Sequence, residues 1–275
     1  MRETVYDKIF KPKTYTLSNG KEVKQRASRA PFILLIVLFV TVVSGEVTGV
    51  DLSMLRTRGH QFIVILTAMF PPNFNFMNNV WGPLFDTIQM SLLGSIAGAL
   101  LAIPFALLSS SNIIRNRLLN GFFKLFLSIL RTLPTLISAL IATFIFGLGT
   151  MAGTVAIFLF TLSYIGKLMY EHIENVDMGA FEAHESMGLS KVEAFRYAIV
   201  PDVLPTYLSV SLYAFEGNIR FAAILGYVGA GGVGLLLDER LGWRDYPSVG
   251  MVLLILMLVV FVIERISEYF RMKLT

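Results

Sequence analysis

Long apolar stretches separated by short polar segments make up most of this chain. Six of them are long enough to cross a bilayer, which takes about 20 mainly apolar residues each. They cover approximately residues 31–50, 82–108, 132–149, 152–170, 203–226 and 248–264. A further apolar run, Phe62–Phe70, is too short to cross and ends at Pro71 and Pro72, so it predicts an interfacial or re-entrant segment. The pattern predicts an all-α integral membrane protein with six spans.

The composition agrees with this pattern. Hydrophobic residues make up 55% of the 275 residues and charged residues 15%, with a mean hydropathy of +0.68, whereas a soluble domain carries about 25% charged residues. The sequence contains no cysteine, which excludes disulfides and thiolate metal sites. The first span follows a basic segment without a small-residue cleavage site, which favours a retained anchor over a signal peptide.

The basic residues are sorted by membrane side. If the N-terminus is cytoplasmic, eighteen lysines and arginines fall on the inner side, while Arg56, Arg58, Arg240 and Arg244 fall on the outer side. Positive charge resists translocation, so this bias predicts that both termini are cytoplasmic. Because the basic residues follow the membrane sides, the lipid bilayer is an expected partner and nucleic acid is not.

Three parts are predicted along the chain. Residues 1–30 form a polar cytoplasmic extension with a turn at residues 18–20, where the sequence reads Ser-Asn-Gly. Residues 31–80 hold the first span and the outer interfacial segment, and residues 81–270 hold the transmembrane core. Within the core, residues 115–131 mix basic and apolar side chains, which fits either an amphipathic helix on the inner surface or the start of the third span.

Small residues repeat along one face of the second span. They are Ser91, Ser95, Gly98 and Ala102. Membrane helices approach one another closely at such stripes. Packing within the chain is the favoured explanation, and a dimer seam or a pore lining is the alternative.

A polar helix–turn–helix, residues 177–201, separates two apolar spans. Asp177 is expected to cap its first helix, and Gly188 is expected to end it in a left-handed conformation. Phe181 stands among acidic residues on this helix, so the helix could insert into a partner's cleft. A soluble-looking module in a membrane protein predicts a docking surface on the cytoplasmic side.

The second helix of this module is predicted to begin with a capping box made by Ser190 and Glu193. On it, Val192, Phe195 and Ile199 are expected to share one face because they are spaced i, i+3 and i+7. Two prolines, at positions 201 and 205, are expected to close the module where the fifth span begins.

The pattern Glu182-Ala183-x4-Gly188-x12-Pro201 resembles the EAA loop of the membrane subunits of bacterial ABC importers. The resemblance implies a coupling helix that docks onto an ATP-hydrolysing subunit. The residues it assigns to this role are Phe181, Glu182, Ala183, His184, Glu185 and Gly188. The match is partial, since His184 replaces the second alanine of the motif, and an ordinary helical hairpin is the alternative.

A second resemblance covers roughly residues 60–265. Residues 213–220 (Tyr-Ala-Phe-Glu-Gly-Asn-Ile-Arg) and the glycine-rich run Gly226–Gly234 are similar to the phosphonate-type permeases of ABC importers. So are residues 70–74, 131–134 and 147–149. Relatives in that family are described for phosphate and phosphite, so the resemblance implies import of an organophosphonate, phosphate or phosphite.

Glu216 and Arg220 lie one helical turn apart in the fifth span and can form an ion pair. Counted from Leu204 at about 1.5 Å per residue, Arg220 is expected toward the outer half of the membrane. Charged residues in a span normally face a cavity or a partner. The pair therefore predicts either a pathway wall that attracts an anionic headgroup or an internal ion pair, and Asn218 between them joins the pathway candidates.

The five glycines of Gly226–Gly234 tolerate backbone conformations that other residues do not adopt. Irregular backbone at membrane depth must be buried in protein or face water, so this run predicts a gate or re-entrant turn, with Gly229, Gly231 and Gly232 as pathway residues. It lacks the Lys-Ser/Thr of a phosphate-binding P-loop. ATP and magnesium are therefore expected on a partner chain, and no cofactor is expected on this one.

The resemblance implies a type I ABC importer permease in a bacterial inner membrane. It implies a homodimer, two ATP-binding subunits and an extracytoplasmic phosphonate-binding protein as partners. The main alternative is a secondary transporter of a small anion, which should show broken helices in both halves. An enzyme is not expected, because His60, His172 and His184 are far apart and neither a catalytic set nor a metal motif occurs.

Overall fold

The computed structural model describes residues 14–24 and 30–274, and the chain divides into two units, Met1–Ile63 and Val64–Thr275. The first unit holds an antiparallel pair of strands, β1 (Thr14–Thr16) and β2 (Glu22–Lys24). Gly20 has a φ of +75° in the connecting turn, which confirms the turn predicted at residues 18–20. The other parts of the predicted extension, residues 1–13 and 25–29, lie outside the described residues.

The first unit continues with helix α2 (Ala30–Val47), which corresponds to the first predicted span and has no buried residue. Helix α3 (Leu52–Ala68) follows and continues into the second unit. Most of the apolar run Phe62–Phe70 forms the second half of this helix, which ends at Ala68. Helix α3 is not among the helices that are long and apolar enough to cross a membrane, as expected for that run.

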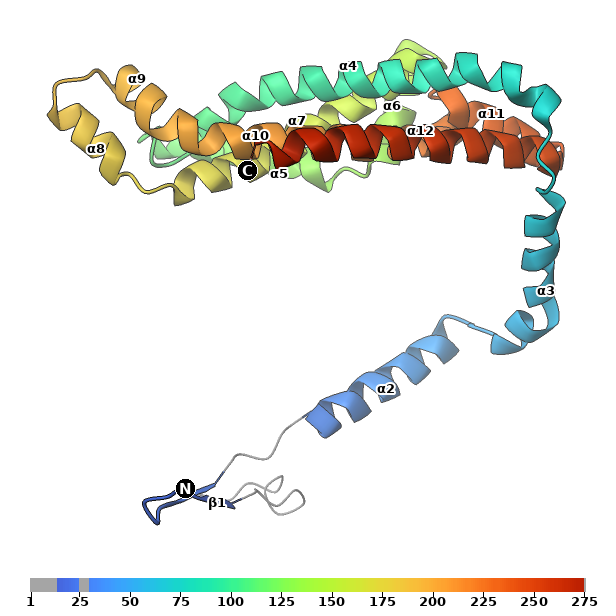
Figure 1. Ribbon diagram of the computed structural model, residues 1–275, viewed down its shortest axis with the longest axis horizontal. Helices are drawn as coiled ribbons and strands as arrows, with labels where there is room; N and C mark the ends of the chain where they lie inside the picture. The colour runs from blue at the N-terminus through green and yellow to red at the C-terminus, as the bar shows by residue number, and fades with distance from the viewer. Residues whose placement is uncertain (1–13, 25–29, 275) are drawn as a thin grey trace. The chain divides into compact units, whose positions relative to one another are not determined.

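The second unit is a bundle of helices. In Figure 1 the long helices α4, α7, α10 and α12 lie alongside one another, with α8 and α9 at one end of the bundle and α11 near the other. The helices are α4 (Met77–Ser109), α5 (Arg117–Thr132), α6 (Thr135–Phe146), α7 (Thr150–Asn175), α8 (Gly179–Ser186), α9 (Lys191–Ala194), α10 (Val200–Leu225), α11 (Gly232–Gly242) and α12 (Tyr246–Met272). Single turns of other helix types occur at Phe74–Phe76, Phe195–Ile199 and Gly226–Val228.

Five helices in the described part of the chain could cross a membrane, or six if the bent pair α5 and α6 counts as one span. The two helices meet at an angle of 91°, at Leu133 and Pro134, because a residue before proline is disfavoured in a helix. The predicted third span, residues 132–149, is therefore wrong in its extent. Helix α6 has 12 residues, or about 18 Å, against the roughly 30 Å of a hydrocarbon core. Residues 117–132 do form a helix, α5, and both predictions for this segment, an amphipathic helix on the inner surface and the start of the third span, stay predictions.

The stripe of small residues on α4 packs inside the chain. Ser91, Ser95 and Ala102 are buried, and a Cβ at Gly98 would lie 2.7 Å from the Cβ of Thr161 on α7. Because real Cβ atoms essentially never come within 3.0 Å of other atoms, any residue larger than glycine at position 98 would push α4 and α7 apart. The favoured prediction, packing within the chain, is confirmed.

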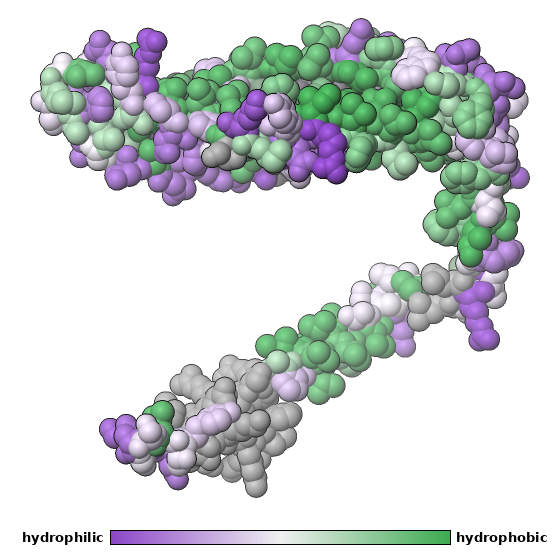
Figure 2. Space-filling view, in the orientation of Figure 1, coloured by the Kyte–Doolittle hydropathy of each residue, from purple (hydrophilic) through white to green (hydrophobic). Residues whose placement is uncertain are grey.

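The outer surface of the bundle carries many exposed apolar side chains. Figure 2 shows hydrophobic residues over much of the visible face of the bundle and more hydrophilic residues at its ends. A large exposed apolar surface on long helices is what a bilayer accommodates and water does not.

Candidate functional site

Helix α8 is a short, well-defined element at one end of the bundle. The Asp177 carboxylate accepts a hydrogen bond from the backbone N–H of Gly179 at 2.9 Å, so it caps the first turn as predicted, although Met178 is the residue directly before the helix. Gly188 has a φ of +91°, which confirms the predicted left-handed end. Both ends of α8 are thus set by side chains and backbone within a few residues of the helix.

The second helix begins at the predicted capping box. The backbone N–H of Ser190 donates to the Glu193 carboxylate at 2.9 Å, and the N–H of Glu193 donates to the Ser190 hydroxyl at 3.4 Å. The helix does not close at its prolines: Pro201 lies in the first turn of α10 and Pro205 inside it. Helix α10 begins at Val200, so the two prolines do stand at the start of the fifth span, as predicted, although the chain stays helical through them.

A π-helical turn, Phe195–Ile199, joins α9 to α10 without a break. A π turn holds one more residue than an α turn, so the predicted face of Val192, Phe195 and Ile199 is divided. Ile199 is buried, whereas Val192 is 77% exposed. The joined helix runs over 38 residues, Lys191–Val228, and is about 57 Å long.

Helix α8 has two different faces. Glu182 and Ala183 are exposed, as is Gly188 beyond its end, while Phe181 and Glu185 are half-buried and line a groove of about 650 Å³. The groove's other walls come from residues 112–116, between α4 and α5, and from α9. His184 is also half-buried, and its Nδ1 lies 2.7 Å from the carbonyl oxygen of Ala180. The six predicted coupling residues therefore lie together, but only part of the set faces outward.

A polar cluster at the base of α8 was not anticipated from the sequence. The Glu174 carboxylate, near the end of α7, accepts hydrogen bonds from Lys124 Nζ at 2.8 Å and from the backbone N–H of Ser111 at 2.7 Å. Asn112 Nδ2 donates to the carbonyl oxygen of Ile173 at 2.6 Å. These contacts tie α5 and the segment after α4 to the end of α7, four residues before α8 begins.

The predicted ion pair in α10 is present. Arg220 Nη2 lies 2.8 Å from Glu216 Oε1, and Glu216 is buried while the Arg220 side chain is 51% exposed. The second carboxylate oxygen lies 3.4 Å from Arg271 Nη2, on α12. Glu216 is thus level with the C-terminal end of α12. If the C-terminus is cytoplasmic, this contact places Glu216 and Arg220 toward the inner side of the membrane, in conflict with the prediction that Arg220 lies in the outer half. That prediction counted from Leu204, whereas the continuous helix begins at Lys191.

Asn218 is buried among three helices. Its Nδ2 donates to Ser95 Oγ on α4 and to Thr161 Oγ1 on α7, each at 2.8 Å. The side chain therefore links α4, α7 and α10, and its predicted place in a pathway remains a prediction.

The glycine run forms the turn between α10 and α11. Gly229, Gly231 and Gly232 all have positive φ values, from +69° to +78°. The carbonyl oxygen of Gly229 accepts from the N–H of Gly149 at 2.9 Å, and Thr87 Oγ1 accepts from the N–H of Val233 at 2.8 Å. This irregular backbone is largely buried against α4 and the start of α7, as irregular backbone in a membrane protein must be.

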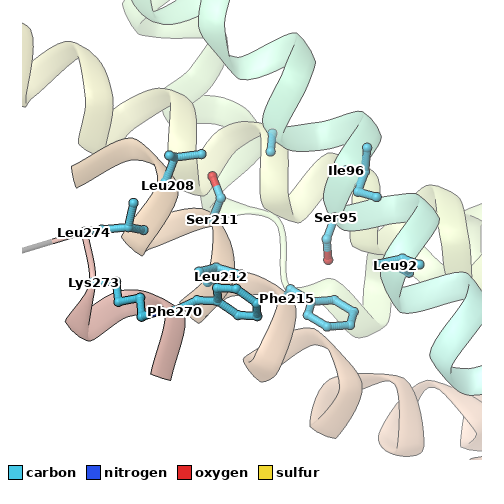
Figure 3. Close-up of a pocket in the computed structure, with 11 residues that line it drawn as sticks. Leu92, Ser95, Ile96, Leu208, Ser211, Leu212, Phe215, Phe270, Lys273 and Leu274 are labelled. Atoms are coloured by element: carbon cyan, nitrogen blue, oxygen red, sulfur yellow. The ribbon is translucent and has the colours of Figure 1, made fainter. Parts of the chain in front are cut away.

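A hollow of about 580 Å³ opens between α4, α10 and the end of α12 (Figure 3). Its walls are mainly apolar, and it is lined by Leu92, Ser95, Ile96, Ala99, Leu208, Ser211, Leu212, Phe215, Phe270, Lys273 and Leu274. Lys273 is the one charged residue of this lining, and the apolar remainder suits a hydrophobic group better than a charged solute. Among the described residues, no cluster of three or more His, Asp or Glu side chains could hold a metal ion.

Residues 94–275 match the model of the family described as binding-protein-dependent transport system inner membrane component. The chain belongs to this family. Its members are permease subunits of ABC importers in the bacterial inner membrane, which work with ATPase and binding-protein partners. The predicted function class and location are therefore confirmed.

Two relatives in the family are named for the transport of phosphate and of phosphite. The chain is 31% identical over 211 residues to the phosphate-import permease protein PhnE of Mycolicibacterium smegmatis, covering 76% of this chain and 40% of that protein. It is 30% identical over 201 residues to the phosphite transport system permease protein PtxC of Stutzerimonas stutzeri, covering 73% of each.

Solved permease structures share the fold. A chain of the inward-facing MetNI methionine ABC transporter superimposes with a TM-score of 0.65 at 21% identity, covering 74% of this chain and 99% of that one. A chain of an amino acid ABC transporter gives a TM-score of 0.60 at 19% identity. The predicted type I ABC importer permease fold is confirmed, whereas the cytoplasmic location of both termini stays a prediction.

Proposed function

We propose that this permease carries a phosphorus oxyanion, such as an organophosphonate, phosphate or phosphite, into the cytoplasm, and that α8 is the helix through which an ATPase subunit drives it. The substrate class is supported by the names of the two relatives and by the motifs at residues 213–220 and 226–234. The permease itself supplies a path and a binding surface and carries out no chemistry.

The observation that carries the coupling assignment is the combination of exposure and rigidity in α8. No residue of this helix is buried, yet both of its ends are closed by hydrogen bonds. A helix of eight residues is too short to be stable by itself in water, so a helix that projects from the bundle and is fixed at both ends suits docking into a partner's cleft.

Movement of α8 would reach the membrane helices through two rigid connections. The Glu174 cluster ties the end of α7 to α5. On the other side, α9 continues through the π turn into α10 as one long helix. A push on α8 would therefore rotate α7 and α10 together, and these two helices carry Phe160, Tyr164, Tyr213 and Arg220.

The remaining parts of the proposed assembly are those that the family resemblance implies. Two copies of this chain would line one pathway, two ATP-binding subunits would hold ATP and magnesium, and an extracytoplasmic binding protein would deliver the solute. Both termini and α8 would lie in the cytoplasm. The glycine turn of Gly229, Gly231 and Gly232 would act as a gate at the opposite end of the bundle.

The test is uptake of methylphosphonate by proteoliposomes that contain the permease, its ATPase and its binding protein. Uptake is expected only when ATP is supplied on the ATPase side. Uptake by the permease alone, driven by an ion gradient, would instead support the secondary-transporter alternative. Inorganic phosphate and phosphite as competitors would rank the substrates.

A further inference from the structure

A second hollow, of about 450 Å³, lies between α7 and α10 and differs in character from the apolar one. Phe160 and Tyr164 line it from α7. Tyr213, Gly217 and Arg220 line it from α10. It therefore combines an aromatic wall with a half-exposed guanidinium.

Two more arginines stand against the tyrosines of this hollow. The guanidinium carbon of Arg131, from α5, lies 5.7 Å from the ring centre of Tyr164. That of Arg271, from α12, lies 5.6 Å from the ring centre of Tyr213. Arg220 thus lines the hollow itself, and arginines from two other helices lie against two of its tyrosines.

Glu216 fixes the positions of two of these arginines. Its buried carboxylate bonds Arg220 through one oxygen and Arg271 through the other. The single negative charge of Glu216 is thus shared between two guanidinium groups. Arg220 is also half exposed in a membrane-spanning helix, and such a residue faces water or a protein partner rather than lipid tails. A guanidinium in that position can donate hydrogen bonds to an anionic ligand in the hollow.

We propose that this hollow is a binding site for a doubly charged phosphorus oxyanion, with Arg131 and Arg220 donating to its oxygens. The proposal rests on the proposed function and names the site where the transported solute is held. A planar guanidinium matches the spacing of two oxygens on phosphorus. The Phe160 ring, which stacks on Tyr164 at 5.7 Å, would lie against the organic substituent of a phosphonate.

The test is binding of methylphosphonate to the purified full-length permease in phosphatidylcholine nanodiscs, followed by phosphorus NMR line broadening. Arg131→Gln is the central variant, because Arg131 takes no part in the Glu216 ion pairs. We expect binding at least about tenfold weaker, which is the loss for one charge-assisted hydrogen bond. Arg220→Lys should retain part of the affinity that Arg220→Gln loses.

Two further variants separate binding from folding. Gly217→Leu would fill the hollow without changing any charge, since a Cβ at Gly217 meets no atom within 4 Å, and it should abolish the broadening. Arg265→Gln is the control, because Arg265 pairs with Glu268 elsewhere on α12. Equal binding by the wild type, Arg131→Gln and Gly217→Leu would overturn the site.

A lipid phosphate shares this chemistry, so the lipid is varied as well. If phosphatidylglycerol in the nanodisc displaces methylphosphonate completely, the hollow belongs to a lipid headgroup and the assignment to a free solute is overturned. Persistence of the broadening supports it. ATP-driven uptake by the Arg131→Gln complex is measured in parallel: normal uptake would overturn this site alone, whereas absent uptake by the wild type would overturn the proposed function.

Discussion

The backbone N–H of Leu189 donates to the carbonyl oxygen of His184 at 3.3 Å, across the end of helix α8. One residue earlier, the N–H of Gly188 donates to the carbonyl oxygen of Glu185 at 3.0 Å. With Gly188 left-handed, the two bonds form a Schellman ending. The orientation of the proposed coupling helix therefore depends on one glycine.

Replacing Gly188 should uncouple the transporter. Proline cannot adopt a positive φ and has no N–H for Glu185, so Gly188→Pro is expected to abolish uptake while ATP hydrolysis by the complex continues. Gly188→Ala keeps the N–H and meets no neighbouring atom, so it should show only the roughly 1–2 kcal/mol cost of the left-handed conformation and a partial loss. Gly121→Ala, in helix α5 with open space around it, is the control. Normal uptake by Gly188→Pro would remove the coupling assignment.

Reversing the charge of Glu182 should weaken docking of the ATPase. The Glu182 side chain is exposed on the outward face of α8, so Glu182→Lys leaves the fold intact. Co-purification of the ATPase should fall by about tenfold or more, the effect of a charge repulsion of about 1.4 kcal/mol. The exposed Asp238→Lys, on α11 at the other end of the bundle, changes the net charge equally and should leave co-purification unchanged. An undiminished ATPase yield with Glu182→Lys would argue against α8 as the docking helix.

Removing the Glu174 carboxylate should lower uptake per ATP hydrolysed. Glu174→Gln weakens the bonds from Lys124 and Ser111 that tie α7 to its neighbours, so motion of α8 is transmitted less fully. Lys124→Glu combined with Glu174→Lys should restore part of the ratio. The pair Lys167 and Glu171, which lie 3.8 Å apart within α7, supplies the control Lys167→Met. A ratio unchanged by Glu174→Gln would contradict the transmission route.

Asn218→Ala should destabilise the permease by about 1–2 kcal/mol, the scale of a buried interhelical hydrogen bond in a membrane. The change removes both bonds that link α10 to α4 and α7. The measurement is the unfolding midpoint in detergent. A double-mutant cycle of Asn218→Ala with Ser95→Ala should give a coupling energy that shows the two side chains stabilise each other. Asn175→Ala, whose side chain bonds only its own helix on the exposed surface, should leave the midpoint in place.

Gly226→Ala should disrupt the turn between α10 and α11. A Cβ at Gly226 would overlap the backbone of Gly234, and a Cβ at Gly234 would overlap the carbonyl oxygen of Ala223. Backbone atoms on both sides cannot move aside as a flexible side chain can, so either alanine variant should lower the unfolding midpoint sharply. Gly242→Ala, with no atom within 4 Å of its Cβ, should be neutral. A normal midpoint for Gly226→Ala would show that the two segments are not closely packed.

Features that depend on short stretches of chain were predictable from the sequence. Apolar length located five of the spans. The Asp177 cap, the left-handed Gly188 and the capping box of Ser190 and Glu193 were all expected and are all present. Each of these is made by groups within five residues of one another, so the residues that encode the feature also complete it. The Glu216–Arg220 pair belongs to the same class, since its partners are one turn apart.

Features that join distant residues could not be read in this way. The contact of Arg271 with Glu216 spans 55 positions, and the bond from Asn218 to Ser95 spans 123. A π turn moved Val192 out of the face it was expected to share, and a sharp bend shortened the third span. Which side chains meet across helices depends on how those helices rotate and cross, and a change of one residue in a turn rotates everything after it by about 100°. The placing of Arg131 and Arg271 against tyrosines of the hollow that Arg220 lines is therefore a property of the packed bundle, although each arginine is visible in the sequence.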